Sequence, residues 1–254
     1  MLLSEMNWPD VKEKIKENPV VIIPTGSTEQ HGPGLPLHTD IDSSYSLAKK
    51  AGEITDSLVA PPLNYGYSEL WQHYPGTMSL KARTFQDAVT DICESLIRVG
   101  LKNIFIINGH NPNLPLLKQV VYELTDKYEK EDIRLAAGTY IFMAKEECDK
   151  IGDNFRDGTH ANEFETSFQL FLHPSLVKFD RIKDRDSKGR EVISFRKENT
   201  VVNKWPDPDN FDGIYGAPSR ATKEKGEKYF NAMIEDIVEF IEEFRKGNYD
   251  PISK

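Results

Sequence analysis

Short apolar runs recur along the chain at intervals that suit a buried sheet. Val20–Ile23 and Ile104–Ile107 consist mostly of β-branched residues, and each run is followed by loop-forming residues. Such short runs predict buried strands. Weaker runs at 58–60 and 135–137 predict two further strands.

Between these strands, apolar residues recur every three to four positions in 85–97, 116–128 and 229–244. That spacing places them on one face of an amphipathic helix. For the first helix, Thr84 is the expected N-cap and Gly100 the expected stop. Strands that alternate with helices predict an α/β fold, in which a mainly parallel sheet is covered by helices on both faces.

Length and charge narrow the class of protein. A chain of 254 residues fits a single domain over 1–254, within which the polar segment 183–216 is expected to form a long excursion that covers a site or meets a neighbouring subunit. A net charge of −9 disfavours nucleic acid as a partner, because phosphate binding needs clustered Lys and Arg. We find no bilayer-length apolar run and no signal peptide, so we expect no membrane partner and a cytoplasmic protein. Cys93 and Cys148 are too few and too distant for a disulfide framework.

The densest polar segment, GSTEQHGPGLPLHTD, follows the first predicted strand. In an extended chain Glu29 and His31 point the same way, since side chains alternate with period two. The Gly and Pro residues after them favour a turn that returns Asp40 to this pair. Two carboxylates and an imidazole suit Zn²⁺, Mn²⁺ or a similar cation. The alternative for Asp40 is a simple N-cap of the next helix.

A second polar segment, NGHNPN, follows the run 104–107 and contains His110. Ligands of open α/β sheets gather at the carboxyl ends of strands, so this segment and the first one are expected to meet there. The alternative for His110 is a loop histidine that binds backbone groups. Asn111 and Asn113 are candidate substrate contacts, and His73 in WQHYPGT is a weaker one.

A third segment, DGTHANEFETS, leads into a helix with a phenylalanine-rich face. Glu163 and Glu165 are two residues apart, so on a helix they point in nearly opposite directions. Glu165 lies nearer the apolar face, and a buried carboxylate needs a partner that a cation would supply. The alternative is that both glutamates occupy the first turn because they favour the helix dipole.

The remaining histidines and large aromatic residues carry less information. His38 and His173 are interpreted as surface or loop residues. Trp71, Tyr74 and Trp205 are interpreted as packing residues, because large aromatic side chains contribute mostly buried area.

With these motifs in view, the chain resembles the creatininase family of creatinine amidohydrolases. The matching segments run in the family's order and cover most of the chain: GSTEQHGPGLPLHTD, YGYSELWQHYPGTMSL, NGHNPN, HANEFETS and, less closely, GIYGAPSRATKEKG. The resemblance implies a three-layer α/β/α fold and two divalent metal ions, Zn and/or Mn, with Fe as a further option. It also implies a ring-shaped homo-oligomer, often a hexamer, that acts on a small molecule.

By the same resemblance, the metal ligands on matching positions would be Glu29, His31, His110 and Asp40, with Asp40 bridging the two ions. Creatininase itself has a further glutamate ligand where this chain has Pro112, which cannot coordinate through its side chain. Glu165 is the expected substitute.

Proton transfer and substrate contact would fall to the third segment. His160 matches the family's proton-transfer histidine, Asp157 matches a substrate contact, and Glu163 is a candidate to orient His160. Arg156 stands where creatininase has a tryptophan, which suggests an anionic substrate such as the phosphate-bearing formylamino-pyrimidine of the family's deformylases. The alternative is an ion pair of Arg156 with Glu163 or with a neighbouring subunit.

The sequence therefore supports the hypothesis of a metal-dependent amidohydrolase, in which a metal-bound hydroxide cleaves a C–N bond of a cyclic amide or formamide. One alternative is creatinine hydrolysis proper. A two-metal phosphoesterase would use the same ions, and a non-catalytic small-molecule binding or assembly protein would keep the same fold.

Overall fold

The computed structural model describes residues 1–152, 160–185, 194–197, 200–203 and 207–248. Its helices and strands are α1 (Trp8–Ile15), β1 (Val20–Thr25), α2 (Thr39–Ile54), β2 (Leu58–Val59), α3 (Ala82–Arg98), β3 (Asn103–Asn108), α4 (Leu114–Lys127), β4 (Arg134–Thr139), α5 (Lys145–Ile151), α6 (Glu163–Leu172), β5 (Ser194–Lys197), β6 (Thr200–Asn203) and α7 (Lys223–Lys246). Short 3-10 turns lie at Leu3–Glu5, Glu69–Trp71, Asn111–Asn113, Tyr140–Phe142, Pro174–Leu176, Phe179–Arg181 and Pro218–Arg220.

One parallel sheet, in the order β2-β1-β3-β4, forms the centre of the fold. Its register pairs Thr25 with Asn108 and Asn108 with Thr139, so that three strands end side by side. The Asn108 side chain links these ends, because it accepts a hydrogen bond from Thr25 Oγ1 (3.2 Å) and donates one to Thr139 Oγ1 (2.9 Å). The loops after β1 and β3 therefore start from one shared edge.

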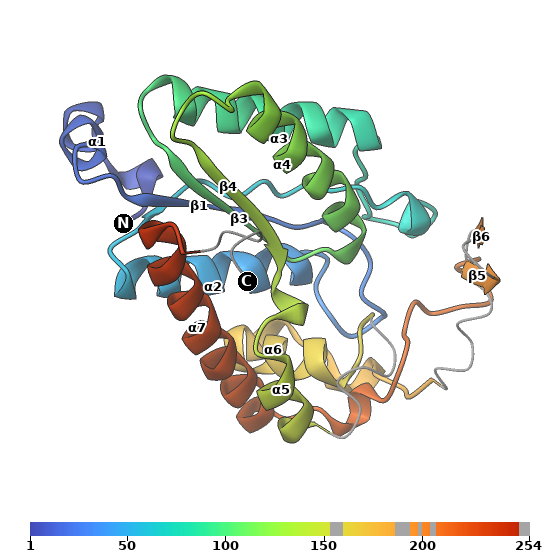
Figure 1. The fold of residues 1–254 in the computed structure, drawn as a ribbon. Coiled ribbons are helices and arrows are strands. Elements are labelled where there is room, and N and C mark those ends of the chain that lie inside the picture. Colours follow the sequence, from blue (N-terminus) through green and yellow to red (C-terminus); the bar gives the residue numbers. More distant parts are fainter. Residues whose placement is uncertain (153–159, 186–193, 198–199, 204–206, 249–254) are drawn as a thin grey trace.

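Helices cover both faces of this sheet (Figure 1). Along β1, Val20 and Ile22 pack into a core with α2, α6 and α7, whereas Val21 and Ile23 pack into a second core with α3 and α4. This alternation follows from the period of two in a strand, and it explains why the run is apolar at every position. The structure confirms the three-layer α/β/α fold with a parallel central sheet.

Two glycines allow α2 to begin directly against the strand ends. A Cβ on Gly26 would lie 2.7 Å from the backbone N of Ile41, and a Cβ on Gly109 would overlap the backbone carbonyl of Asp40. Any larger residue would push the first turn of α2 away from β1 and β3. The close approach places Asp40 at the edge where the two polar loops begin.

Several local predictions need correction. Helix α3 begins at Ala82, with extended Lys81 as its N-cap, so Thr84 lies inside the first turn and is not the cap. The N-cap of α2 is His38, which excludes the N-cap role for Asp40. Helices α1 and α5 were not predicted. Within 183–216, β5 and β6 form a separate antiparallel pair.

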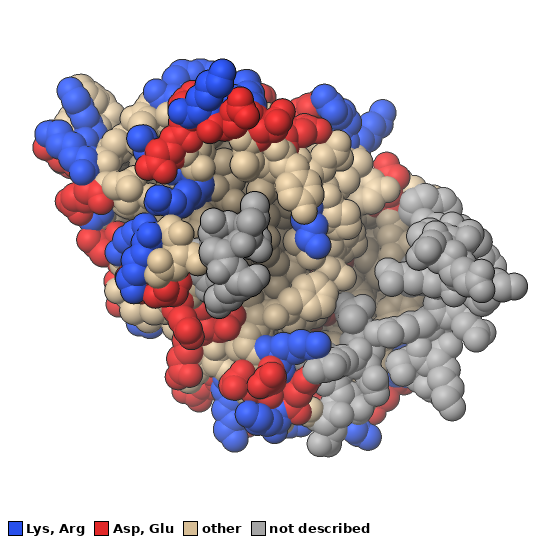
Figure 2. Space-filling model, in the orientation of Figure 1, with Lys and Arg blue, Asp and Glu red and all other residues tan. Residues whose placement is uncertain are grey.

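In the part of the chain that the structure describes, no helix is both long and apolar enough to span a membrane. On the face drawn in Figure 2, Lys and Arg side chains are interspersed with Asp and Glu side chains over α3 and α4 and along α7. The expectation that nucleic acid is not a partner stays a prediction.

Candidate metal centre

Six polar side chains converge where β1 and β3 end, and each of these residues is 1–8% exposed. They come from the loop after β1, the first turn of α2, the loop after β3, and the start of α6. The structure thus brings together the five predicted ligands and the predicted proton-transfer histidine: Glu29, His31, Asp40, His110, Glu165 and His160.

Two triads within this cluster share Asp40. Ligand atoms of Glu29, Asp40 and His110 lie within 4.8 Å of one another, and so do those of His31, Asp40 and Glu165. Asp40 Oδ2 lies 2.9 Å from His110 Nδ1, while Asp40 Oδ1 lies 3.1 Å from His31 Nε2. Because each oxygen faces a different triad, the carboxylate has the geometry of a bridge between two ions.

Backbone groups orient the side chains of both triads. The far ring nitrogen of His110 lies 2.9 Å from the carbonyl oxygen of Tyr67, and that of His31 lies 3.2 Å from the carbonyl oxygen of Glu29. A proton on that nitrogen leaves the other nitrogen free to bind a metal, as is usual for ligating histidines. Glu165 Oε2 accepts a hydrogen bond from the backbone N–H of Ala161 (2.5 Å).

Burial and mutual charge shift the pKa values of the cluster. Burial raises the pKa of Glu29 and of Glu165 to about 7. Burial alone would lower the pKa of His31 and His110, but the adjacent carboxylates outweigh it and raise these values to about 10 and about 9. Burial also opposes ionisation of Asp40, yet the charges of His31 and His110 hold its pKa well below the usual range. The metal-free cluster therefore holds protons at atoms that would ligate a cation.

Two orphaned atoms support the fit of a cation. Glu29 Oε1 and Asp40 Oδ2 are buried, and neither makes an aligned hydrogen bond to the described residues. His110 Nδ1 lies 3.4 Å from the first and 2.9 Å from the second. Imidazole and carboxylate ligands in a buried set suit Zn²⁺ or Mn²⁺, and an ion would satisfy both orphaned oxygens.

Two neighbours of His160 were missed as functional residues. Gln30 places its carbonyl oxygen 2.8 Å and its side-chain nitrogen 2.9 Å from His160 Nε2. The indole of Trp71 stacks on the imidazole of His160 at 4.4 Å between ring centroids, and the ring of His31 lies 4.3 Å from it at a tilt of 34°. Burial lowers the pKa of His160 well below its usual value. Gln30 had a signal in the sequence, because it lies between two predicted ligands, Glu29 and His31. No sequence signal indicated that Trp71 would stack on His160.

Glu163 does not contact His160. Its Oε1 lies 2.5 Å from Lys225 Nζ of α7, which corrects the prediction that it orients the histidine. The reason is the left-handed conformation of Ala161 (φ 50°), which turns the chain between the two residues, so their spacing of three is not helical. Gln30 makes the contact with His160 that was predicted for Glu163.

The predicted substrate contacts are dispersed. Asn113 is buried, and its side-chain amide donates a hydrogen bond to the carbonyl oxygen of Gly26 (3.0 Å) and accepts one from the backbone N–H of Tyr67 (2.9 Å). Because these bonds connect two loops and use both ends of the amide, the prediction of a substrate contact is wrong. Asn111 and His73 are exposed and lie outside the cluster of ligand atoms. Arg156, Asp157 and Trp205 lie outside the described residues.

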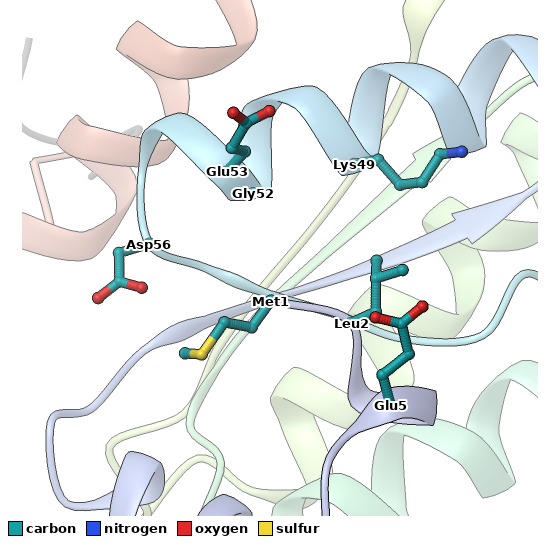
Figure 3. Close-up of a pocket in the computed structure, with 7 residues that line it drawn as sticks. All are labelled: Met1, Leu2, Glu5, Lys49, Gly52, Glu53 and Asp56. Carbon is teal, nitrogen blue, oxygen red and sulfur yellow. The ribbon is translucent and has the colours of Figure 1, made fainter.

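A separate pocket of about 390 Å³ lies at the far end of α2 (Figure 3). Its lining residues are Met1, Leu2, Glu5, Lys49, Gly52, Glu53 and Asp56. Along α2, Lys49 to Glu53 are roughly 14–20 Å from Asp40 at the helical rise per residue. The acidic residues of the pocket have their own partners, since Glu53 pairs with Lys50 (3.1 Å) and Asp56 pairs with Lys14 (2.6 Å). At this distance from Asp40, the pocket is separate from the metal centre.

A buried carboxylate–imidazole cluster at the carboxyl edge of a parallel sheet is the arrangement of a metal-dependent α/β enzyme. The family model described as Creatininase, creatinine amidohydrolase, matches residues 4–241. The chain therefore belongs to the creatininase family.

Similar proteins agree with this family. Creatinine amidohydrolase of Pseudomonas putida is 26% identical over 258 residues, which cover 96% of each chain. A mycofactocin precursor peptide peptidase of Mycobacterium ulcerans (strain Agy99) is 29% identical over 239 residues, covering 90% of this chain and 87% of that one. A solved manganese form of creatininase superposes with a TM-score of 0.83 at 26% identity, and a zinc–zinc mutant form with 0.82 at 26% identity; each comparison covers 96% of this chain and 98% of the other.

Proposed function

We propose that this protein is a metal-dependent amidohydrolase that cleaves a C–N bond of a cyclic amide or formamide in a small molecule. The observation that carries the proposal is the pair of buried triads joined by Asp40. The zinc and manganese forms of the related creatininase support a two-ion centre of Zn and/or Mn. The amidohydrolase name of the Pseudomonas putida relative supports the C–N bond.

The proposed ligands are Glu29 and His110 for one ion, His31 and Glu165 for the other, and Asp40 for both. Two such ions would acidify a water molecule and polarise the substrate carbonyl. The protein's part is to fix the geometry, since five ligand side chains are held by packing and backbone contacts before any substrate binds.

His160 is the proposed proton carrier. Gln30 holds Nε2 of His160, so the free Nδ1 faces the centre, 3.7 Å from Glu29 Oε1. A buried imidazole with a lowered pKa is neutral at pH 7, so Nδ1 can accept a proton and later pass it to the leaving nitrogen. Packing of the His160 ring against Trp71 and His31 keeps the ring in this orientation.

The rest of the proposal follows the family expectation. Arg156, Asp157, His73 and Asn111 remain the proposed substrate contacts. We also propose a single domain, a cytoplasmic location and a homo-oligomer, with a hexamer as the expected size. The peptidase relative makes a peptide amide the second substrate class to examine.

The test is a metal-controlled assay of the purified protein. It compares creatinine, other cyclic amides, formamides, short peptides and phosphate esters, before and after chelation and after addition of Zn²⁺ or Mn²⁺. We expect hydrolysis of an amide-type substrate that chelation abolishes and metal restores. Hydrolysis of phosphate esters alone, or a protein that retains no metal, would overturn the proposal.

A further inference from the structure

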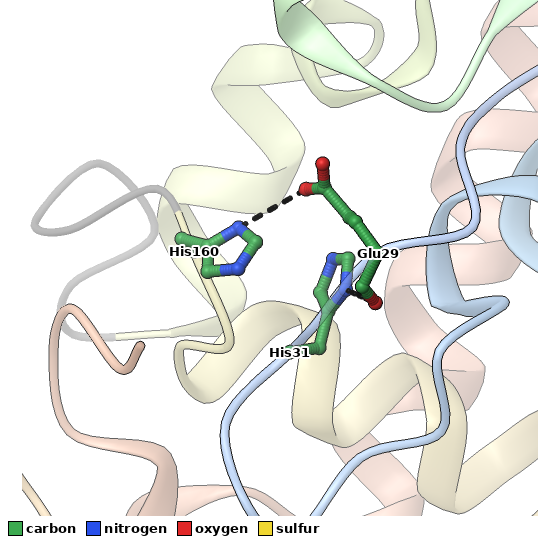
Figure 4. A group of neighbouring side chains, drawn as sticks. All are labelled: Glu29, His31 and His160. Carbon is green, nitrogen blue, oxygen red and sulfur yellow. Dashed lines mark hydrogen bonds and ion pairs between the residues drawn. The ribbon is translucent and has the colours of Figure 1, made fainter. Parts of the chain in front are cut away.

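A third group of potential ligand atoms overlaps the two triads. Atoms of Glu29, His31 and His160 also lie within 4.8 Å of one another, and all three side chains are buried (Figure 4). This group uses the proposed proton carrier in place of the bridging aspartate.

The separation of His160 and Glu29 suits a shared ion better than a hydrogen bond. His160 Nδ1 lies 3.7 Å from Glu29 Oε1, beyond the range of about 2.7–3.2 Å for a hydrogen bond. Two tetrahedral ligands of one zinc ion, each about 2.0–2.2 Å from it, lie roughly 3.4 Å apart. His110 Nδ1, a proposed ligand atom, lies 3.4 Å from the same oxygen.

The far side of His160 also resembles that of a ligating histidine. Nε2 of His160 lies 2.8 Å from the carbonyl oxygen of Gln30 and 2.9 Å from its side-chain nitrogen, while Nε2 of His110 lies 2.9 Å from the carbonyl oxygen of Tyr67. When Nε2 of His160 carries a proton, it donates a hydrogen bond to the Gln30 carbonyl. In both residues Nδ1 is the nitrogen that faces the carboxylates. A proton on Nε2 would leave a lone pair on Nδ1 directed at Glu29, which is the tautomer that a metal ligand requires.

We propose that Glu29 and His160, beside His31, form a third cation position, and that excess Zn²⁺ fills it and inhibits the enzyme. The inference rests on the proposed function, because an ion on Nδ1 occupies the lone pair that transfers the proton. A third ion and a proton on Nδ1 of His160 are mutually exclusive.

This position is weaker than the first two. His31 Nε2 already lies 3.1 Å from Asp40 and 4.0 Å from Glu165, so His31 contributes fully only when the second ion is absent. With both ions in place, a third retains one imidazole and one shared carboxylate, and it is repelled by its neighbours. The third equivalent is therefore exchangeable and appears only at higher zinc concentration.

The experiment measures zinc per chain by equilibrium dialysis and elemental analysis, together with turnover, as free Zn²⁺ rises. We expect two tightly held equivalents, then a third whose binding coincides with loss of turnover. His160→Ala should keep the first two equivalents and lose the third. The matched control is His173→Ala, which removes a half-exposed imidazole elsewhere and should keep all three.

The possible results are distinct. A third equivalent that persists in His160→Ala, or is lost in His173→Ala, overturns the inference, as does a wild-type protein that stops at two. Failure to hold the first two equivalents refutes the proposed function instead. Circular dichroism checks that His160→Ala is folded; if it is not, anomalous scattering from wild-type crystals in excess zinc decides, by the presence or absence of a peak between Glu29 and His160.

Discussion

Two histidine–aspartate clusters use the same turn of α2 and differ in burial. Asp40 points into the metal centre, where it and His31 are almost inaccessible (side chains 3% and 0% exposed). Two residues later, Asp42 contacts His38 Nδ1 at 2.7 Å and His173 Nε2 at 3.3 Å. We call Asp42, His38 and His173 the outer cluster; their side chains are 22%, 44% and 41% exposed.

The difference shows that residue type alone does not make a metal centre. The side chains of the outer cluster are 22–44% exposed, so solvent screens its charges more than those of the centre, and its single carboxylate lies between two imidazoles. In the centre, three carboxylates and three imidazoles share a buried space, so protons or cations must balance them. Among the described residues, the outer cluster also lacks three ligand atoms within 4.8 Å of one another.

The largest expected difference in metal content and turnover is between Asp40→Ala and Asp42→Ala. Asp40→Ala removes the one carboxylate common to both triads, so bound metal and turnover should both be lost. Asp42→Ala should retain two equivalents of metal and most of the turnover. Elemental analysis and a steady-state assay measure both, and full metal content in Asp40→Ala would refute the bridge.

His160→Ala should lower kcat by about 10²–10⁴, the usual contribution of a positioned acid–base group. Because His160 is not part of either triad, the first two metal equivalents should remain. His173→Ala is the control from the outer cluster and should have a nearly normal kcat. An unchanged kcat in His160→Ala would remove its role in proton transfer.

The next effect concerns the partly buried ion pair of Glu163 and Lys225, whose side chains are 2% and 26% exposed. Lys225→Met leaves a buried carboxylate without its partner and should lower the free energy of unfolding by about 3 kcal/mol. Glu163→Gln added to Lys225→Met should recover part of that loss. Denaturant unfolding measures both variants, and a stability change confined to the metal-loaded protein would contradict this structural role.

Chelation should make the stability of the protein depend on pH. The folded-state pKa values of His31 and His110, about 10 and 9, lie above the ordinary imidazole value of 6.5. Their stabilisation is therefore complete below about pH 6.5 and is lost as the pH rises through 9 to 10. The raised pKa values of Glu29 and Glu165 have the same effect at lower pH: their stabilisation is lost as the pH rises from 4.5 to about 7. The Tm of the chelated protein should fall from pH 7 to 10.

Bound metal should weaken this dependence, because cations replace the protons. The metal-induced rise in Tm should thus increase with pH over the same range. Thermal unfolding with and without chelator measures it. A chelated protein that becomes more stable toward pH 10 would show that the centre does not hold these protons.

The smallest effect is expected for Asp42→Asn. Ion pairs that are partly open to solvent contribute about 0–1 kcal/mol, so the free energy of unfolding of Asp42→Asn should change by no more than about 1 kcal/mol. A matched Asp40→Asn variant measures the buried counterpart. Equal effects of the two variants on metal content would remove the distinction between the clusters.

The layered fold could be predicted from local pattern alone. The apolar runs that became β1 and β3 are buried at every position because both faces of the sheet are covered, and this leaves a signal in consecutive residues. The loop from Glu29 to Asp40 was also predictable, since strand alternation and a Gly/Pro turn act over short distances. The α3 boundary was missed because Lys81 caps the helix through backbone conformation, with no side-chain signal.

The sequence by itself therefore determined the layers, the parallel sheet and the identity of the residues that gather at its edge. Only the tertiary structure decided their partners. Glu163 pairs with a lysine 62 residues away, and Trp71 stacks on a histidine of another loop. The physical reason is distance along the chain: strand and helix periodicity relates neighbouring residues, whereas contacts between separate loops depend on how the layers pack and on single turns such as the one at Ala161.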